Sequence, residues 1–249
     1  MSAAINHGEQ LSKLLKKINR KTCTDHSAGF DPIDQFVYSS LLWDSTHTKA
    51  NSAFKRIKAS TVDLNDFRVG SYEEIIAILG ERYPRVSHRA ERLRASLNDI
   101  YGRMHAVSLD ALGQMGKREA RALLDSLDGA LPFVTARVML LSFDAHAIPV
   151  DDRTHALLLS EGVIEEGVDI PKAAGIIERA VKAADGLTVH NKLQAWSESN
   201  GKTKSAAAKA ATKKKSSGKN TTAKSTRTTK STKTTKTTRA TKSRARTAS

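Results

Sequence analysis

Two features between Lys117 and His155 have residue types and spacing that could do chemistry. The first is a tight reversal of the chain around Gly129, where backbone N–H groups at a helix start can hold an anion. The second is a pair of adjacent carboxylates, Asp151 and Asp152, in a short loop after that reversal. We therefore begin with the elements that must position these groups.

The reversal is predicted to join two helices. Apolar residues recur at helical spacing from Ala120 to Leu127 and again from Val134 to Leu141, which gives each predicted helix one buried face. Gly129 can take a positive φ and end the first helix, and Pro132 presets the first turn of the second. The free N–H groups of the second helix could then bind a DNA phosphate. The alternative is an ordinary turn between two core helices.

The same segment resembles a known superfamily. The run LDGALPFVTARV, followed by PVDDRTH, resembles the hairpin and the downstream V-D-T-H-like segment of the endonuclease III and helix-hairpin-helix DNA glycosylases. Two upstream stretches are also similar to that superfamily, DPIDQFVYSSLLWDSTHTKANSAFKRI with its opening helices and HRAERLRASL with the helix before the hairpin. The similarity covers roughly residues 30–185.

The resemblance implies an all-α fold of two helical subdomains whose groove receives a nucleotide swung out of the duplex. It also implies that an aspartate at the pocket mouth stabilises the cationic sugar or activates water. Matching the V-D motif selects Asp151, whereas counting from Thr135 and noting the doubled D-D selects Asp152, which we favour. Either aspartate could instead only cap the following helix. The DNA contacts expected from the resemblance are Gly129, Ala130, Leu131, Phe133, Thr135, Arg137 and Ser45.

Three departures from the superfamily pattern refine the expected activity. Val134 stands where bifunctional members carry the lysine that forms a Schiff base, so we expect no lysine-dependent strand cleavage. The second hairpin glycine is replaced by Leu131 or Ala130, which crowds the approach of a phosphate. The single cysteine, Cys23, cannot supply the four ligands of the superfamily's iron-sulfur cluster, and we expect neither a cofactor nor a metal.

The rest of residues 30–199 is predicted to be helical, because no convincing period-two alternation occurs. Asp31 and Pro32 form a good cap and first turn for a helix, and Ser71 with Glu74 fits a capping box. A further helix is expected from about Val86 to Tyr101. Residues 1–29 are expected to contain a separate amphipathic helix with a basic face.

Residues 200–249 form a strongly basic tail. Sixteen of the 41 Lys and Arg residues lie beyond the last acidic residue, Glu198, so the first 200 residues are close to neutral. The tail contains Lys, Thr, Ser and Ala without large apolar side chains, a composition typical of disordered chains that bind nucleic acid by counterion release. Its expected contacts with double-stranded DNA include Lys213, Lys214, Lys215, Lys230, Lys233 and Lys236. The alternatives are a solubilising tail or an RNA-binding one.

The sequence has no run of 18 apolar residues and no signal-peptide pattern at its start. With one cysteine it can form no internal disulfide. We therefore expect an intracellular protein in the cytoplasm or nucleoid, without membrane association, and the resemblance to the glycosylases implies a monomer. Two functions remain open at this stage: a DNA glycosylase without lyase activity, and a non-catalytic nucleoid-associated protein that keeps the fold and the tail.

Truncation of the chain after Asn200 is predicted to flatten the salt dependence of DNA binding. Each phosphate contact contributes about 0.9 to the slope of log affinity against log salt, so losing the tail cations should reduce that slope. Fluorescence anisotropy with one duplex between about 50 and 200 mM salt measures it. An unchanged slope in the truncated protein would count against a DNA-binding tail.

Overall fold

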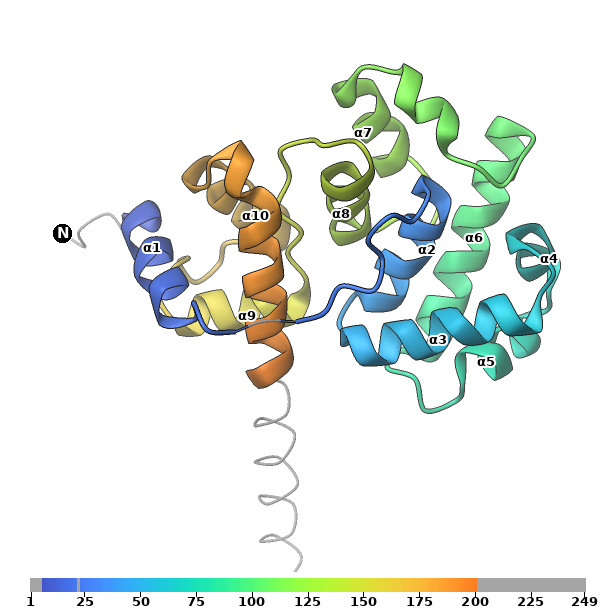
Figure 1. Cartoon of the computed structure of the whole chain (residues 1–249), viewed down its shortest axis with the longest axis horizontal. Helices are drawn as coiled ribbons and strands as arrows, with labels where there is room; N and C mark the ends of the chain where they lie inside the picture. The colour runs from blue at the N-terminus through green and yellow to red at the C-terminus, as the bar shows by residue number, and fades with distance from the viewer. Residues whose placement is uncertain (1–5, 22, 201–249) are drawn as a thin grey trace, which may run out of the picture. The chain divides into compact units, whose positions relative to one another are not determined.

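The computed structural model describes residues 6–21 and 23–200, which belong to one compact unit (Figure 1). These residues form helices and loops without a β-strand, which confirms the predicted all-α class. The helices are α1 (His7–Lys17), α2 (Pro32–Leu42), α3 (His47–Ser60), α4 (Leu64–Val69), α5 (Tyr72–Leu79), α6 (Val86–Met104), η1 (Asp110–Gln114), α7 (Lys117–Asp125), α8 (Pro132–Ser142), α9 (Asp152–Ser160), α10 (Ile170–Ala180) and η2 (Ala183–Asp185). A last helix covers 186–200.

Local sequence signals set several helix starts as predicted. The Asp31 side chain accepts a hydrogen bond from the Asp34 N–H, and Pro32 is the first residue of α2. Ser71 and Glu74 form the predicted capping box of α5, with both reciprocal hydrogen bonds present. These ends are explained by residues within one helical turn.

The larger hydrophobic core is organised around α2. This helix contacts α3, α6 and α8 (Figure 1). Its residues from Gln35 to Leu42 are buried, including the polar ones. The helices α5 and α7 complete this core through Leu79 and Leu124, which are fully buried. The segment before the hairpin and the hairpin itself therefore share one core.

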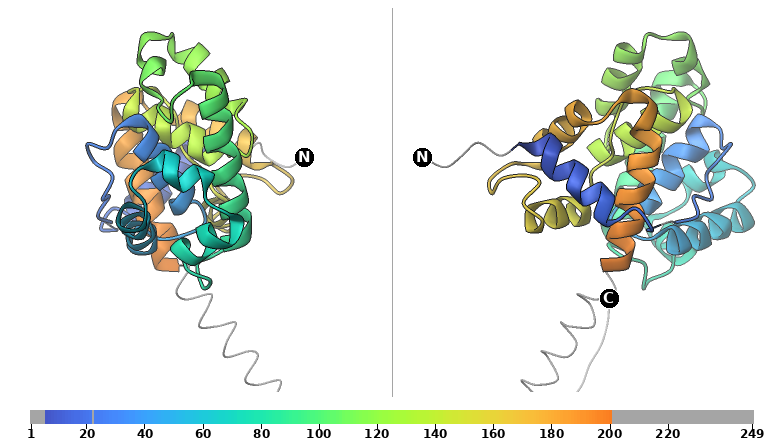
Figure 2. Two further views of the ribbon diagram at one scale, coloured as in Figure 1. Left: turned by 90° about the vertical axis from the view of Figure 1, so that its right-hand side faces the viewer. Right: turned by 60° about the vertical axis from the view of Figure 1, so that its left-hand side comes forward.

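A second hydrophobic core joins the two ends of the described chain. It contains Leu11 and Leu14 of α1, Leu158 of α9, Ile177 of α10 and Trp196 of the last helix. The helix α1 lies beside α10 (Figure 2). The predicted N-terminal helix thus packs with the C-terminal elements, and the two cores correspond to the two expected subdomains.

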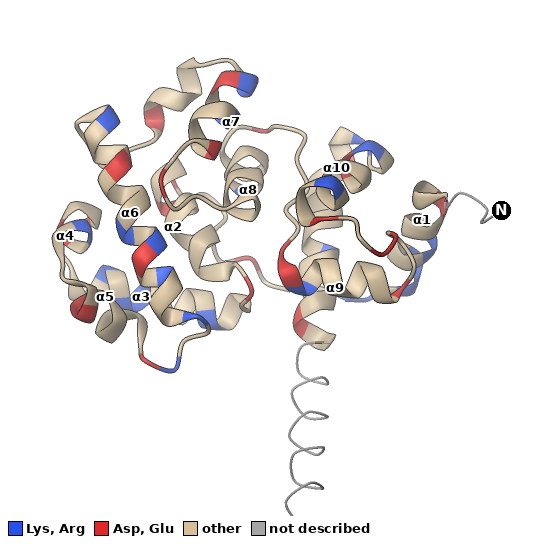
Figure 3. Cartoon of the chain, turned by 180° about the vertical axis from the view of Figure 1, so that it is seen from behind, with Lys and Arg blue, Asp and Glu red and all other residues tan. Residues whose placement is uncertain are grey.

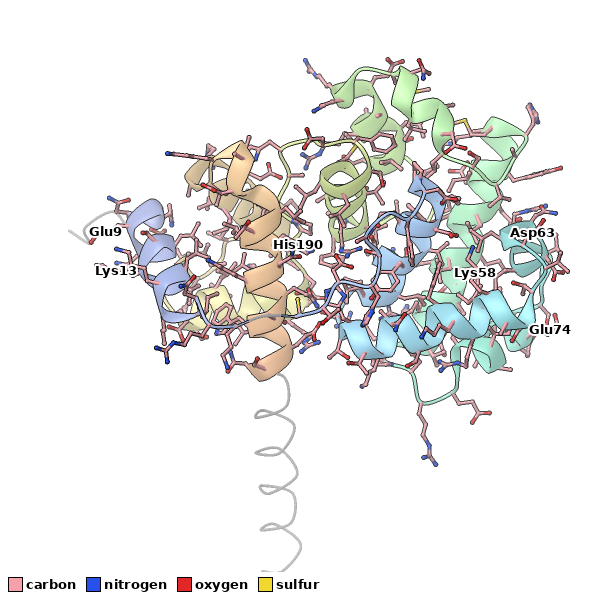
Figure 4. All side chains as sticks on the ribbon, in the orientation of Figure 1. Glu9, Lys13, Lys58, Asp63, Glu74 and His190 are labelled. Atoms are coloured by element: carbon pink, nitrogen blue, oxygen red, sulfur yellow. The ribbon has the colours of Figure 1, made fainter. Side chains whose placement is uncertain are left out.

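The prediction that α8 has one buried face is wrong, because its residues from Phe133 to Met139 are all buried. Arg137 is 0% exposed and forms an ion pair of 2.5 Å with Asp25, which lies in the segment between α1 and α2. Its guanidinium also donates to Ser39 Oγ at 3.0 Å and to His190 Nε2 at 3.3 Å. His190 comes from the last helix and lies toward α8 (Figure 4).

The electrostatics of this network follow from burial and charge. Burial alone would raise the pKa of Asp25, but the Arg137 guanidinium and hydrogen bonds from Ser27 lower that pKa to about 2. Burial and the nearby Arg137 charge lower the pKa of His190 to about 3, so its ring is neutral at pH 7. The network holds one ionised carboxylate against one buried cation.

Replacing Asp25 with Asn is predicted to destabilise the protein by about 3 kcal/mol or more at pH 7, because Arg137 would keep a buried, unpaired charge. Urea unfolding measures this loss. The double variant Asp25→Asn/Arg137→Met should recover most of it, since no charge then stays buried.

The effect of Asp25→Asn should also depend on pH. A depressed native pKa stabilises the fold above the unfolded value and loses that contribution as pH falls toward 2. The difference between wild type and variant should therefore shrink in acid. A constant difference from pH 7 to pH 3 would contradict the assigned ion pair.

Candidate active site

The predicted hairpin is present between α7 and α8. Gly129 has a φ of +72°, and a Cβ atom built there would lie 2.7 Å from the carbonyl oxygen of Arg92 on α6. The Asp128 carbonyl accepts a hydrogen bond from Ser96 Oγ at 2.7 Å, and the Gly129 carbonyl accepts one from Arg92 at 3.3 Å. One side of the turn is therefore fixed against α6.

The other side of the turn is accessible. Asp128 is exposed, and Gly129, Ala130 and Leu131 are half-buried. The Ala130 N–H donates to the Leu127 carbonyl at 3.1 Å, whereas the N–H groups of Gly129 and Leu131 donate to no group among the described residues. The turn thus offers donors that a phosphate could accept from.

Four other residues predicted to contact DNA are buried in this structure, which corrects those expectations. Phe133 and Thr135 lie in the core on α8, and Arg137 belongs to the buried network. Ser45 is 2% exposed and donates to the Tyr83 hydroxyl at 3.3 Å. The side chains of all four are covered by protein, so DNA cannot reach them in this structure.

Asp151 is the N-cap of α9 and is 1% exposed. Its Oδ1 accepts from the Thr154 N–H at 2.8 Å, and its Oδ2 accepts from the Asp44 N–H at 3.2 Å. The first bond caps α9, as the alternative interpretation of this residue expected. The second ties the start of α9 to the loop after α2.

Asp152 is the first residue of α9, and 46% of its side chain is exposed. Its Oδ2 lies 3.4 Å from an Arg85 nitrogen, at the start of α6. It lines an open cavity of about 300 Å³, whose other lining residues are Asp44, Arg85, Arg153, Ala156, Leu157, Ser197 and Asn200. Asp152, and not Asp151, therefore faces the cavity.

Asp44 is a second carboxyl group that lines this cavity, and the sequence reasoning missed it. It follows α2 with a φ of +50°, and only 6% of its side chain is exposed. Its Oδ2 lies 2.9 Å from Arg85, and its Oδ1 accepts from the Arg153 N–H at 3.3 Å. No local motif marks it, because its partners are about 40 and 110 residues away in the chain.

Burial and the charges of Asp151 and Asp152 raise the pKa of Asp44 to about 7, although Arg85 acts against them. A hydrogen bond with Asp152 contributes to the same rise. The cavity therefore combines an exposed carboxylate with a carboxyl group that is half-protonated near neutral pH.

Basic residues on α6 connect the cavity to the hairpin. Lys and Arg positions occur along α6 (Figure 3). Arg85, His88 and Arg92 are spaced by one and two helical turns, with Arg85 and His88 exposed and Arg92 half-buried. Arg85 pairs with the cavity carboxylates, while Arg92 contacts the hairpin at Gly129. Seven residues of helix separate the two contacts, about 10 Å along the axis.

The loop after α2 is held by arginine and aromatic contacts. The guanidinium carbon of Arg85 lies 4.8 Å from the centroid of the Trp43 ring, and that of Arg89 lies 5.5 Å from it. Arg89 is buried and donates to the carbonyls of Ser40 and Trp43. Trp43 is half-buried beside the site.

Other polar residues near α9 have structural partners. His155 shares a hydrogen bond of 2.7 Å with the Val168 carbonyl. No group of three acidic, His or Cys side chains in residues 6–21 and 23–200 could hold a metal ion. In the same residues, no helix is long and apolar enough to cross a membrane. The predicted tail contacts from Lys213 to Lys236 lie outside the described residues.

Solved structures with a similar arrangement of helices are DNA-repair enzymes. A non-covalent complex of endonuclease III with DNA matches with a TM-score of 0.59 and 13% identity, over 75% of this chain and 84% of that one. The chain has the fold of the helix-hairpin-helix DNA glycosylases. A 3-methyladenine DNA glycosylase of H. pylori, MagIII, bound to 1,N6-ethenoadenine, matches with a TM-score of 0.59 and 12% identity, over 79% of this chain and 99% of that one.

A third match with this glycosylase fold is a thermostable thymine-DNA glycosylase, with a TM-score of 0.51 and 18% identity, over 76% of this chain and 83% of that one. No family model and no curated protein sequence matches the chain. The resemblance seen in the hairpin motif thus extends to the whole helical arrangement. At these identities the matches show the fold, and the chemistry must be argued from the site.

Replacing Gly129 with Ala is predicted to destabilise the protein by about 2 kcal/mol or more, because a Cβ would meet the Arg92 backbone in a left-handed conformation. Thermal unfolding measures this. Gly102→Ala is the matched control: Gly102 lies exposed in α6 with open space around it, and the change should be neutral or slightly stabilising. Equal effects of the two variants would contradict the close packing of the hairpin on α6.

Proposed function

We propose that this protein is a DNA glycosylase that hydrolyses the N-glycosidic bond of a damaged base swung out of duplex DNA. The observation that supports it most is the exposed Asp152 carboxylate at the start of α9, in an open cavity between the two cores. The glycosylase fold of the chain adds support at the level of architecture.

The proposed DNA-binding surface runs from the hairpin to the cavity. The N–H groups of Gly129 and Leu131 would donate hydrogen bonds to a phosphate, and Arg92 and His88 would contact the same strand along α6. With the phosphates held at the hairpin and along α6, the adjacent nucleotide would lie at the mouth of the cavity. The basic tail would add sequence-independent affinity.

The proposed chemical step uses the two adjacent aspartates differently. When the bond between C1′ and the base nitrogen breaks, the electron pair leaves with the base and the sugar becomes cationic. Asp152 would stabilise that cation and accept a proton from the water that adds to C1′. Asp151 would act as a positioning residue, because its buried carboxylate fixes the start of α9.

The site supports hydrolysis without a covalent enzyme intermediate. Among the described residues, none that lines the cavity is a lysine. Val134, at the position of the lysine in bifunctional members, is 1% exposed. A Schiff base would need an amine at the sugar, so we propose that strand cleavage by this route does not occur.

Asp152→Asn is predicted to lower single-turnover base release by about 100-fold or more with little change in stability, since the side chain is half-exposed. Asp151→Asn should lower both activity and stability, because one of its two buried N–H donors would lose its acceptor. Duplexes carrying uracil, alkylated, etheno or oxidised bases provide the assay, read as abasic strands cleaved by alkali.

Borohydride trapping with the same duplexes is expected to yield no covalent complex. Release of no base from any duplex, with DNA binding intact, would overturn the glycosylase proposal in favour of a non-catalytic DNA-binding protein.

A further inference from the structure

We propose that Asp44 carries the proton that the departing base receives, and that the site therefore acts on neutral damaged bases. This inference rests on the proposed glycosylase function and names the class of substrate for the same cavity. It adds a proton donor to the sugar-stabilising Asp152.

The geometry places Asp44 beside both aspartates of α9. Its backbone N–H donates to Asp151 Oδ2, and its own carboxyl group lies at the cavity wall between Arg85 and the N–H of Arg153. Arg85 bridges the site, because its two terminal nitrogens lie 2.9 Å from Asp44 and 3.4 Å from Asp152. Two carboxyl groups, Asp44 and Asp152, thus lie at one end of the cavity, and the buried Asp151 lies directly behind them.

The other arginines near these carboxyl groups, Arg153 and Arg89, donate to backbone carbonyls instead. The Arg153 guanidinium donates to the carbonyls of Ser45 at 2.6 Å and Ser197 at 2.9 Å. Arg89 donates to the carbonyls of Ser40 in α2 and of Trp43 just after it. Only the Arg85 guanidinium forms ion pairs with this cluster among the described residues. Three neighbouring acidic groups, two of which pair with the same single cation, favour the retention of one proton.

Burial selects Asp44 as the site of that proton. Its side chain is 6% exposed, against 46% for Asp152. Asp151 is more deeply buried, but two N–H donors compensate its charge. Burial and the two neighbouring carboxylates raise the pKa of Asp44 to about 7, so that the acid form is well populated in neutral solution.

The backbone at Asp44 fixes this arrangement. A φ of +50° is uncommon outside glycine and is found mainly for Asn and Asp. The hydrogen bond from the Asp44 N–H to the buried Asp151 keeps the residue in this conformation. Strained backbone of this kind is typical of functional sites, and here it holds the carboxyl group at the cavity wall.

Every proton transferred in the proposed reaction comes from Asp44 or from the attacking water and passes between groups in the cavity. As the bond between C1′ and the base nitrogen breaks with its electron pair on the base, the Asp44 carboxyl gives its proton to the base. Arg85 stabilises the resulting carboxylate. Water then adds its oxygen to C1′ and gives a proton to Asp152, which returns it to Asp44 through their hydrogen bond. The products are the neutral free base and the abasic sugar.

The need for this proton depends on the base. An alkylated base such as 7-methylguanine already carries a positive charge and leaves as a neutral molecule without an acid. A neutral base such as hypoxanthine would leave as an anion unless it is protonated. A donor in the cavity therefore accelerates the release of neutral bases selectively.

The test compares wild type with Asp44→Asn on duplexes carrying hypoxanthine or 7-methylguanine, under single-turnover conditions from about pH 5 to 9. Asn is compatible with positive φ and resembles the protonated acid in shape, so the variant should fold. Asp144→Asn is the matched control, because Asp144 also has positive φ (45°) but is exposed and does not line the cavity.

For wild type, hypoxanthine release should fall as pH rises through about 7, the pKa of Asp44, because the acid form is lost. Asp44→Asn should release hypoxanthine about 100-fold more slowly and lose that pH dependence, while 7-methylguanine release changes by less than about threefold. In ¹³C spectra, one aspartate carboxyl should titrate near pH 7 in wild type and disappear in Asp44→Asn. Asp144→Asn should match wild type throughout.

Three results would overturn the inference alone and leave the glycosylase proposal standing. These are release of 7-methylguanine but not hypoxanthine by wild type, an equal loss for both bases in Asp44→Asn, or a variant indistinguishable from wild type. Absence of a carboxyl titrating near pH 7 would also overturn it, independently of activity. A wild type that releases no base from any damaged duplex would overturn both proposals together.

Discussion

The buried carboxylate of Asp151 is the group on which the rest of the site depends. A charge removed from water must be compensated by donors, and Asp151 has two backbone N–H groups, one from α9 and one from Asp44. Because α9 belongs to the second core and Asp44 follows α2 of the first, this carboxylate joins the two cores at one point. With Asp151 fixed by these bonds, the next residue, Asp152, lies at the cavity surface. The bond from the Asp44 N–H also holds Asp44 in a left-handed conformation.

Other contacts between the two cores are also polar. Arg137 of α8 meets Asp25 and His190, Arg153 of α9 donates to the Ser45 carbonyl, and the Glu198 carboxylate accepts from the His47 N–H at 2.8 Å. Hydrogen bonds and ion pairs are directional, so they fix one relative position of two helical groups where apolar packing would tolerate several. This explains how a cavity lined by the loop after α2, the start of α6 and the start of α9 keeps a defined arrangement of charges.

What the sequence predicted well was local. The Asp31 cap, the capping box of α5, the positive φ of Gly129 and Pro132 at the start of α8 each depend on residues within a few positions. The hairpin motif also led to the correct fold, because its glycine, proline and apolar residues occur in a fixed order.

What the sequence did not reveal depends on contacts between distant residues. Periodicity gave α8 one buried face, but α2 and the last helix cover its remaining sides, so Arg137 lies in the core. Asp44 is an ordinary aspartate in the sequence, and its role in the site arises only when α6 and α9 bring Arg85, Asp151 and Asp152 to it. The local signals could not distinguish these residues from surface charges.

The hairpin shows why a motif alone does not assign a function. Gly129 is required by the close approach of the Arg92 backbone, and this requirement would hold in a protein that never binds DNA. The residues that follow, Ala130 and Leu131, carry side chains where a second glycine would open the turn to a phosphate. The case for chemistry on DNA therefore comes from the cavity, where two carboxyl groups and one bridging arginine meet at the start of α6, the helix that also contacts the hairpin. A protein that only needed a stable turn would have no use for that concentration of unfavourable charge.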